Sequence, residues 1–408
     1  MIYYTMQKPQ HLHPSDLQGL SRLAVDATRG MTDLVEATHL TIARLPGLCD
    51  PPLHGRTRGI TGLVYANIRG VTRLVGSSLN LLLAGVIPFL DQPATTPQRE
   101  ALLAALNGVL GDHLVETRNP LAIPMGFRLA GQPLKLERQA LAAAFPAADG
   151  RIVVLTHGLC MNDLQWQRQG HDHGAALGRD LGYTPVYLHY NSGLHISSNG
   201  AAFAALLEEL LASWPAPVTE LVILAHSMGG LLARSASEVA AQSGLAWLQH
   251  LRKIIFLGTP HSGSPLERGG HWIDRLLGAN PYSAPFARLG RVRSAGIADL
   301  RHGSLRDSDW QGRDCFSHNC DALQPLPLPE GVAGYACAAV TAETTVLKDR
   351  LANDGLVPLA SALGEHADPA FDLQLPAERK YVRRGIGHFD LLSDPEVYTR
   401  IKAWVMAG

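Results

Sequence analysis

Cysteine is scarce in this sequence, and neither sign of charge is in excess. The 408 residues include 5 Cys, a small and odd number that is unlike the disulfide framework of a compact secreted domain. Lys and Arg together number 35 and Asp and Glu number 36, so the net charge is −1 at pH 7. Nucleic acid is bound largely through cations that neutralise its phosphates. The balanced charge therefore predicts no nucleic-acid partner.

Long apolar runs are also missing. The longest candidate, residues 77–90, is shorter than the roughly 20 residues that span a bilayer. Extending it backwards meets Arg73 and Arg69, which hydrocarbon would penalise. The first residues lack the charged and apolar regions of a secretory signal peptide. We therefore expect no transmembrane helix and a cytoplasmic protein, in which Cys315 and Cys320 are two unpaired thiols rather than a disulfide.

The first 118 residues have a helical pattern. Apolar residues at helical spacing follow Ser15, continue in a second run from about residue 60, and form a third run with Thr96 as N-cap and Pro97 in the first turn. The motif Arg-Gly-x-Thr-x-Leu-Val occurs three times, at 29–35, 58–64 and 69–75. The last two copies are eleven residues apart, close to three helical turns, so they share one apolar stripe that must be buried on something.

Two kinds of partner for this stripe are open on the sequence. The first is the rest of the chain, or a helical hairpin within it. The second is a lipid surface or a second subunit, with basic residues facing anionic head groups as in an interfacial helix. These residues are Arg56, Arg58, Arg69 and Arg73. The second kind of partner would make the protein peripheral to a membrane, and the sequence indicates no oligomeric state.

After Met125 the pattern changes to alternating strands and helices. Strands are predicted at 151–156, 185–189, 220–225, 253–258 and 334–341, and helices at 201–213, 228–243 and 395–406. This alternation predicts an α/β fold, with a mostly parallel central sheet flanked by helices. Residues 262–309 interrupt it with mixed Gly, Pro and Arg content. We expect this stretch to be an insertion.

Ser227 is the predicted nucleophile. It stands between an apolar strand and a helix, with the small residues Ala225 and Gly229 two positions on either side. A strained nucleophile turn needs such small neighbours because strand and helix approach closely there. The alternative, a serine that only caps the helix, explains less of the pattern. Cys160 has no comparable turn and is not predicted to be a nucleophile.

The backbone on both sides of this turn can bind an oxyanion. Met228 begins the helix after Ser227, and Leu159 follows His157-Gly158 at the end of an earlier strand. The backbone N–H groups of Leu159 and Met228 are therefore the predicted oxyanion donors.

The base and the acid are expected after the nucleophile, in the order acid and then base. His388 lies in a glycine-flanked loop before the last helix and is the predicted general base. Asp354 lies in Asn-Asp-Gly-Leu-Val and is the predicted acid that orients the imidazole. Asp390 is the competitor, but it is only two residues from His388.

His171-Asp172-His173 has a metal-like composition but no third ligand nearby. We expect these residues to be solvated rather than to bind a metal, and we predict neither a metal nor a cofactor.

From about Asn119 to Gly408 these motifs resemble the α/β-hydrolase lipases and esterases. Ala-His-Ser-Met-Gly-Gly at 225–230 is similar to the nucleophile turn of small Bacillus lipases, which also carry alanine first. The segments 353–357 and 258–264 resemble the acid loop and the strand-six segment of Pseudomonas-type lipases, and His157-Gly158 matches their oxyanion motif. The resemblance implies an α/β-hydrolase domain over 119–408. We expect 262–309 to cover the active site as a lid, because it follows the carboxyl end of a strand and carries apolar residues such as Trp272 and Phe286. A surface excursion is the alternative. The region 1–118 resembles no family that we can name.

The predicted function is serine carboxylester hydrolysis, esterase-like or lipase-like, through an acyl-enzyme. Ser227 would attack the carbonyl, His388 would take and return the proton, and Asp354 would orient His388. The substrate would be an ester, with a lipid as one candidate. A thioesterase, amidase or acyltransferase would use the same residues, and a non-enzymatic binding protein is the remaining alternative.

Overall fold

The computed structural model describes residues 14–43, 59–86, 96–263, 278, 294–311, 323–342 and 353–407. The chain divides into two compact units, one of Met1–Arg99 with Glu116–Leu121 and one of Glu100–Val115 with Ala122–Gly408. Cys315, Cys320 and most of the expected insertion at 262–309 lie outside the described residues.

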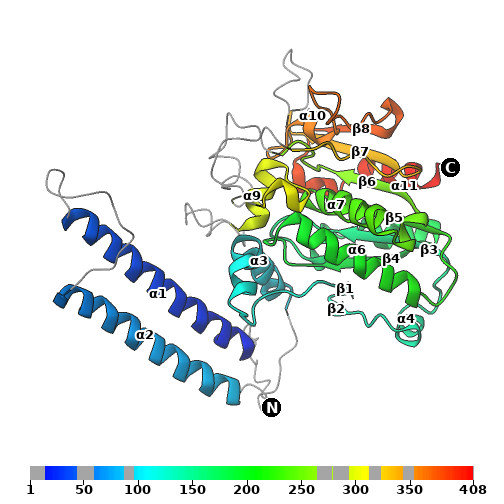
Figure 1. The fold of residues 1–408 in the computed structure, drawn as a ribbon. Helices are drawn as coiled ribbons and strands as arrows, with labels where there is room; N and C mark the ends of the chain where they lie inside the picture. Colours follow the sequence, from blue (N-terminus) through cyan, green and yellow to red (C-terminus); the bar gives the residue numbers. More distant parts are fainter. Residues whose placement is uncertain are drawn as a thin grey trace, which may run out of the picture. The chain divides into compact units, whose positions relative to one another are not determined.

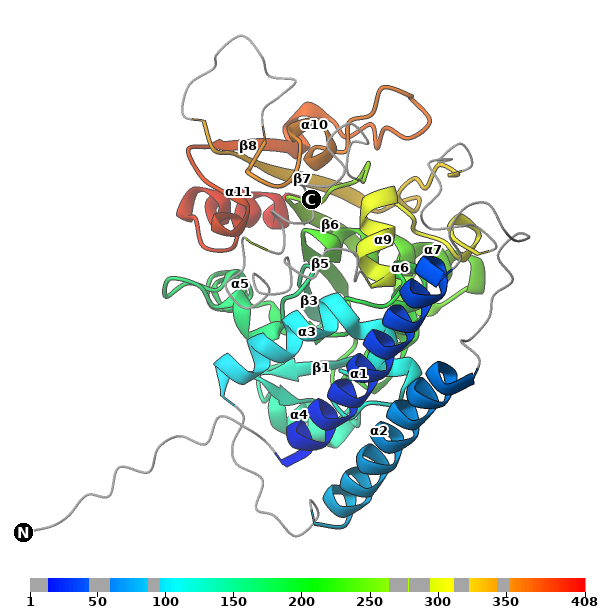
Figure 2. The ribbon, with the colours of Figure 1, turned by 90° about the vertical axis from the view of Figure 1, so that its left-hand side faces the viewer.

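The smaller unit contains two long helices, α1 (Pro14–Ala43) and α2 (Gly59–Val86), which lie side by side (Figures 1 and 2). Their helical character confirms the pattern of the sequence. The seam between them is polar, because Arg69 Nη1 lies 2.8 Å from Asp33 Oδ1 and 2.5 Å from Glu36 Oε2. Arg69 and Glu36 are buried. The hypothesis that Arg69 faces a lipid head group is therefore wrong, since its guanidinium is used inside the hairpin.

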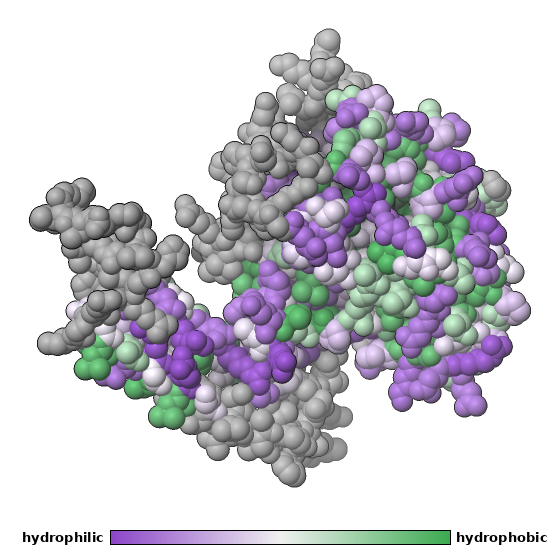
Figure 3. All heavy atoms as spheres, in the orientation of Figure 1, coloured by the Kyte–Doolittle hydropathy of each residue, from purple (hydrophilic) through white to green (hydrophobic). Residues whose placement is uncertain are grey.

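Large apolar side chains of the same two helices are exposed. Figure 3 shows apolar residues in green on the surface of this hairpin. They include Leu17, Leu20, Met31 and Val35 of α1 and Leu63, Val64, Ile68, Val71 and Leu74 of α2, each between 41% and 69% exposed. The hairpin thus buries the Arg69–Glu36 ion pair in its seam, while several of its large apolar side chains are exposed.

The larger unit is built on an 8-stranded sheet with the order β2-β1-β4-β3-β5-β6-β7-β8. The strands are β1 (Gly126–Leu129), β2 (Gln132–Pro133), β3 (Arg151–Thr156), β4 (Thr184–His189), β5 (Glu220–His226), β6 (Leu251–Leu257), β7 (Ala333–Val340) and β8 (Lys380–Arg384). From β4 to β8 neighbouring strands are parallel, whereas β1 is antiparallel to both β2 and β4. The predicted mostly parallel sheet is confirmed.

Helices cover both faces of this sheet because its strands are apolar on both sides. Ile152 and Val154 of β3 pack in one core cluster with α6 (Ile196–Ser213) and α7 (Met228–Ser243). Val153 and Leu155 point to the opposite face, as alternate residues of a strand do, and pack with α5 (His173–Leu181) and α11 (Pro395–Met406). Figure 2 shows the sheet between these two helical layers. The remaining described α-helices are α4 (Arg138–Ala144), α9 (Ala295–His302) and α10 (Leu359–Ala362).

Helix α3 (Pro97–Glu116) belongs mostly to the larger unit, although the sequence places it with the N-terminal helices. Asn107 Oδ1 accepts from the backbone N–H of Ile123 at 2.9 Å, and Asn191 Nδ2 donates to the carbonyl of Gly111 at 3.0 Å. A Cβ on Gly108 would lie 2.3 Å from Cys160 Sγ. These close contacts draw residues 100–115 into the same core as the sheet.

The end of the expected insertion is a packed part of the larger unit. Ile297 and Leu300 of α9 are fully buried, and Asp299 Oδ2 accepts from the N–H of Ile196 at 2.8 Å, at the start of α6. The covering role expected for 262–309 stays a prediction, because residues 264–277 and 279–293 lie outside the described ones. Among the helices that the structure describes, each is too short or too polar to cross a bilayer.

Candidate active site

Ser227 occupies a sharp turn between β5 and α7. Its φ of 54° and ψ of −126° lie in a region that L-residues rarely adopt. The turn is held by two backbone hydrogen bonds, from Ser227 N to Leu257 O at 2.9 Å and from Gly230 N to Ser227 O at 3.0 Å. The strained backbone that the sequence pattern predicts is thus present.

Close packing explains why the residues around this turn are small. A Cβ on Gly229 would lie 2.4 Å from the carbonyl oxygen of Thr156, the last residue of β3. A Cβ on Gly158 would lie 2.9 Å from Cβ of Ser227. Ala225 is fully buried in the core under α7. Any larger side chain at Gly158 or Gly229 would push the turn away from β3.

His388 and Asp354 form a buried hydrogen-bonded pair. His388 Nδ1 donates to Asp354 Oδ2 at 2.6 Å, and the backbone N–H of His388 donates to the carbonyl of Asp354 at 3.1 Å. The other carboxylate oxygen, Oδ1, accepts from the N–H groups of Leu356 and Val357 at 2.9 and 2.7 Å. The carboxylate is therefore fixed from both sides, and it fixes the imidazole ring in turn.

The imidazole of His388 lies at the same edge of the sheet as Ser227. Strand β5 pairs with β6 up to His226 and Leu257, so Ser227 is next to Gly258. A Cβ on Gly258 would lie 2.9 Å from Cε1 of His388, and the rings of His226 and His388 are 4.7 Å apart. His388 Nε2 is buried without a hydrogen-bond partner, so no such bond joins it to Ser227 in this structure. This nitrogen is the ring atom that remains available for a proton.

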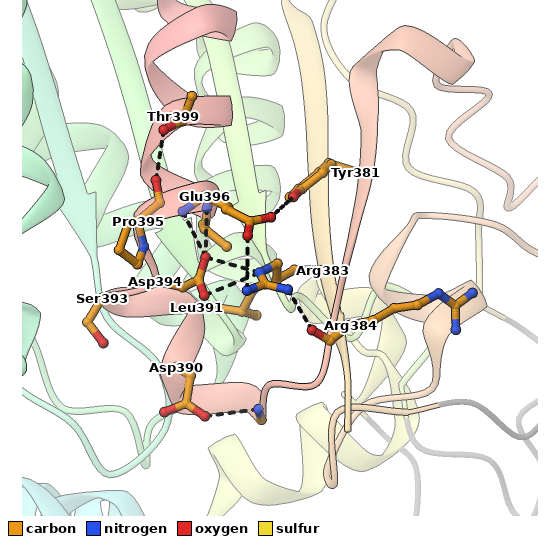
Figure 4. Close-up of polar contacts among 12 residues, drawn as sticks. Tyr381, Arg383, Arg384, Asp390, Leu391, Ser393, Asp394, Pro395, Glu396 and Thr399 are labelled. Atoms are coloured by element: carbon orange, nitrogen blue, oxygen red, sulfur yellow. Dashed lines mark hydrogen bonds and ion pairs between the residues drawn. The ribbon is translucent and has the colours of Figure 1, made fainter. Parts of the chain in front are cut away.

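Charged residues fix the two ends of the loop that carries His388 (Figure 4). At the end of β8, Arg383 Nε lies 3.3 Å from Asp394 and its Nη2 lies 3.2 Å from Glu396. Asp394 also caps α11, because it accepts from the N–H groups of Glu396 and Val397 at 2.9 and 3.0 Å. The loop is thereby tied to β8 at one end and to α11 at the other.

Asp390, the competing acid, is engaged elsewhere. Its Oδ2 accepts from the backbone N–H of Gly387 at 3.0 Å, and its Oδ1 lies 3.8 Å from Arg168 Nη2. The carboxylate that contacts the ring of His388 is that of Asp354.

The two predicted oxyanion donors flank Ser227. Met228 is the first residue of α7, and Leu159 follows Gly158, which packs against Ser227. Among the hydrogen bonds of the described residues, none is donated by the backbone N–H of Leu159 or of Met228. Both N–H groups are therefore available to an oxygen atom bound at this turn.

His157 supports this loop and does not titrate near neutral pH. Its Nδ1 donates to the carbonyl of Gly158 at 2.9 Å, and its ring stacks on Tyr190 with centroids 4.3 Å apart. Burial lowers the pKa of His157 to about 3. Burial likewise raises the pKa of the Cys160 thiol to about 12, which keeps this neighbour protonated and a poor nucleophile.

The expectation that 171–173 are solvated is wrong for His173. Its ring is buried, Nε2 donates to the carbonyl of Leu391 at 2.9 Å, and Nδ1 lies 2.8 Å from Nε2 of His171. Asp172 caps α5 by accepting from the N–H of Ala175 at 2.9 Å. The described residues hold no group of three or more His, Cys, Asp or Glu suited to a metal ion. The hydrogen bond from His173 to Leu391 connects the start of α5 to the segment that follows His388.

Sequence reasoning missed His226 and Arg234. His226 precedes the nucleophile and packs its ring against that of His388. Arg234 is a buried arginine on α7, where an apolar residue is usual. The sequence could have indicated Arg234, because it is a basic residue among the apolar positions of the helix after Ser227.

A comparison of this sequence with protein families identifies the fold. A family profile described as "PGAP1-like alpha/beta domain" matches residues 147–324, a range that contains Ser227 and both predicted oxyanion donors. The fold is that of the α/β-hydrolases. Residues 147–324 are thus similar to this family, and no curated protein matches the sequence.

Several solved structures are distantly similar to this chain. The mature lipase BlEst2 of Bacillus licheniformis has 17% identity, covering 64% of this chain and 94% of that chain, with a TM-score of 0.41. An esterase of Thermogutta terrifontis has 15% identity, covering 64% and 90%, with a TM-score of 0.37. The thioesterase RedJ of Streptomyces coelicolor has 17% identity, covering 64% and 91%, with a TM-score of 0.33.

Proposed function

We propose that this protein hydrolyses carboxylic esters through an acyl-enzyme. The observation that carries the proposal is the His388–Asp354 pair, joined at 2.6 Å beside the strained turn of Ser227. Ser227 Oγ attacks the ester carbonyl, and His388 Nε2 takes its proton and then delivers it to the leaving group. Asp354 holds the Nδ1–H tautomer and stabilises the imidazolium. The Ser227–His388 hydrogen bond forms with substrate in place, since such bonds tighten on binding.

The oxyanion of the tetrahedral intermediate is stabilised by backbone groups. Met228 supplies an N–H at the positive end of α7, a helix of 16 residues, and Leu159 supplies a second from the loop after β3. One such donor contributes about 2.7–4 kcal/mol to the transition state. The same stabilisation would serve a thioester or an amide, so the thioesterase, amidase and acyltransferase alternatives stand beside the ester hydrolase.

A fluorophosphonate probe and a substrate panel test this proposal. We expect the probe to label the protein at Ser227, as located by peptide mass spectrometry. We expect p-nitrophenyl esters to be hydrolysed faster than acyl-CoA or acyl anilides of the same chain length. Faster turnover of acyl-CoA or of anilides would replace the esterase with a thioesterase or an amidase. A protein that is not labelled would be a binding protein.

We further propose that the hairpin of α1 and α2 contacts a lipid surface from one side. Its polar seam and its exposed apolar residues are the reverse of what a helix pair standing in water needs. The exposed residues include Ile68, Val71 and Leu74, and Arg73 beside them is exposed as well. Arg56 and Arg58 lie outside the described residues. An apolar face with basic neighbours suits the boundary of an anionic membrane.

Flotation with anionic liposomes checks this contact. We expect the full chain to float with the liposomes. The double variant Val71→Ser with Leu74→Ser should reduce the floating fraction several-fold, because each substitution removes apolar area that the membrane would bury. Leu102→Ser is the matched control, since this residue is 51% exposed but belongs to α3 in the larger unit. Equal flotation of the double variant and the control, or no flotation of the full chain, would exclude the lipid contact.

A further inference from the structure

The loop that carries the proposed oxyanion donor Leu159 is held by a second segment of the chain. Residues 157–160 follow β3, and we call them the oxyanion loop. Residues 190–195 connect β4 to α6. Tyr190 and Ser192 of this connection are each 1% exposed, and both are hydrogen-bonded to the oxyanion loop. The proposed mechanism gives neither side chain a part in the reaction.

Tyr190 holds the start of the oxyanion loop. Its hydroxyl donates to the carbonyl of His157 at 2.9 Å, and its ring stacks on the ring of the same histidine. Burial raises the pKa of Tyr190, so the phenol keeps the proton that it donates. A Cβ on Gly229 would lie 2.7 Å from the same carbonyl oxygen. The carbonyl of His157 is therefore held between Tyr190 and the first turn of α7.

Ser192 holds the end of the oxyanion loop. Its Oγ accepts from the backbone N–H of Cys160 at 3.0 Å. Cys160 has a φ of 59°, which is rare for a residue with a Cβ and persists only where surrounding contacts enforce it. The thiol of Cys160 also lies 3.7 Å from the carbonyl oxygen of Ala105 in α3. Ser192 thus supplies the acceptor for a backbone group in a strained part of the loop.

The connection from β4 to α6 is itself fixed from two sides. Asn191 Nδ2 donates to the carbonyl of Gly111 in α3 at 3.0 Å, and Asn191 Oδ1 accepts from the N–H of Gly193 at 3.0 Å. The carbonyl of Asn191 accepts from Asn199 Nδ2 in α6 at 2.9 Å. Because both neighbours of Ser192 are held in this way, its hydroxyl lies at a fixed place.

These contacts together set the direction of the Leu159 N–H. The carbonyl of Gly158 belongs to the same peptide unit, and it accepts from His157 Nδ1 at 2.9 Å and from Met161 N at 3.3 Å. A trans peptide unit is planar, so its N–H points away from its carbonyl. Tyr190 holds the preceding peptide unit and Ser192 holds the following one. Three consecutive peptide units are therefore fixed, and the middle one carries the N–H of Leu159.

We propose that Tyr190 and Ser192 are positioning residues of the oxyanion hole. They keep the N–H of Leu159 aimed at the place where the ester oxygen becomes negative, and neither side chain touches the substrate. A donor stabilises an oxyanion only over a narrow range of distances, so a small rotation of this peptide unit lowers kcat. The inference rests on the proposed ester hydrolysis for the oxyanion, whereas the fixing of the loop is measurable without a substrate.

Tyr190→Phe and Ser192→Ala test the proposal, because each removes one buried hydroxyl and adds no atoms. Their matched controls are Tyr187→Phe and Ser197→Ala, which also remove hydroxyls from buried side chains. Tyr187, in β4, donates to Asp172 Oδ1 at 2.8 Å, and the Oγ of Ser197, in α6, accepts from the indole of Trp310 at 3.0 Å. Neither of these hydrogen bonds involves the oxyanion loop.

Steady-state kinetics on a p-nitrophenyl ester gives the first measurement. We expect Tyr190→Phe and Ser192→Ala each to lower kcat about tenfold or more with KM within a few-fold of the wild type, since removing an entire oxyanion donor costs about 10²–10³-fold. The controls should keep the wild-type kcat although their melting temperatures fall by similar amounts. Equal kcat values for the test variants and the controls, in an active wild type, would overturn the positioning role.

Inhibition by a trifluoromethyl ketone gives a measurement that a loss of stability alone does not change. Ser227 Oγ bonds to the ketone carbon, the carbonyl π bond becomes the lone pair of an oxyanion, and the serine proton passes to His388. We expect the inhibition constant to rise in Ser192→Ala and Tyr190→Phe by about the factor by which kcat/KM falls. A wild-type inhibition constant in both variants would contradict the proposal.

Hydrogen exchange measured by mass spectrometry on the peptide that covers 157–161 separates the loop from the reaction. We expect Ser192→Ala to exchange several-fold faster there than the wild type and Ser197→Ala, because the loop opens more often. Unchanged exchange would overturn the fixing of the loop by Ser192. Faster exchange together with a wild type that hydrolyses no ester would overturn the proposed function and the oxyanion role with it, while the fixing of the loop would stand.

Discussion

Replacing Ser227 with alanine is expected to lower kcat on a p-nitrophenyl ester by about 10⁴–10⁶-fold, because the covalent route through an acyl-enzyme is lost. The hydroxyl makes no hydrogen bond to another described residue, and alanine fits the space of the serine Cβ next to Gly158. The fold should therefore be retained, as circular dichroism and the melting temperature will show.

Ser243→Ala is the matched control for this variant. Ser243 is the last residue of α7, at the exposed end of the helix that Ser227 precedes. We expect this variant to hydrolyse the ester at the wild-type rate. Hydrolysis that survives in a pure sample of Ser227→Ala would mean that another group is the nucleophile.

Asp354→Asn is expected to lower kcat by about 10⁴-fold, since a neutral amide no longer holds the Nδ1–H tautomer of His388. The amide oxygen can still accept from the N–H groups of Leu356 and Val357, so the loop should keep its shape. Steady-state kinetics on the same ester, with the melting temperature measured beside them, separates loss of catalysis from loss of folding.

Asp390→Asn supplies the comparison. Its carboxylate accepts from Gly387 N and is partly exposed, with no contact to the ring of His388, so kcat should stay within a few-fold of the wild type. If Asp390→Asn were crippled while Asp354→Asn remained active, the acid would be Asp390 and the proposed assignment would fail.

The elements with strong local signals were predictable from the sequence. Strand β3 and helices α7 and α11 have the bounds that their apolar patterns indicate, because those segments are buried and bounded by turn and cap residues. The strained turn at Ser227 was also predictable, since small residues at fixed offsets are a property of the local chain.

Elements that depend on distant partners were not predictable. Strand β8 has the sequence Lys-Tyr-Val-Arg-Arg, and its residues are only half-buried at the edge of the sheet, so no apolar run marks it. The burial of Arg69 depends on Asp33 and Glu36, which are more than thirty residues away in the sequence. The hydrogen bond between Ser192 and Cys160 likewise joins two loops that local periodicity does not relate.

The order of these elements along the chain has a consequence for synthesis on the ribosome. The turn of Ser227 follows β5, whereas Asp354 follows β7 and His388 follows β8. Strand β8 joins the sheet through β7 alone. Because the chain emerges from its N-terminus, a nascent polypeptide that has reached only β6 contains the proposed nucleophile but neither the proposed acid nor the proposed base. Under the proposed mechanism, such a chain does not hydrolyse esters. Hydrolysis begins only after β8 and the loop of His388 have been synthesised and β8 has paired with β7.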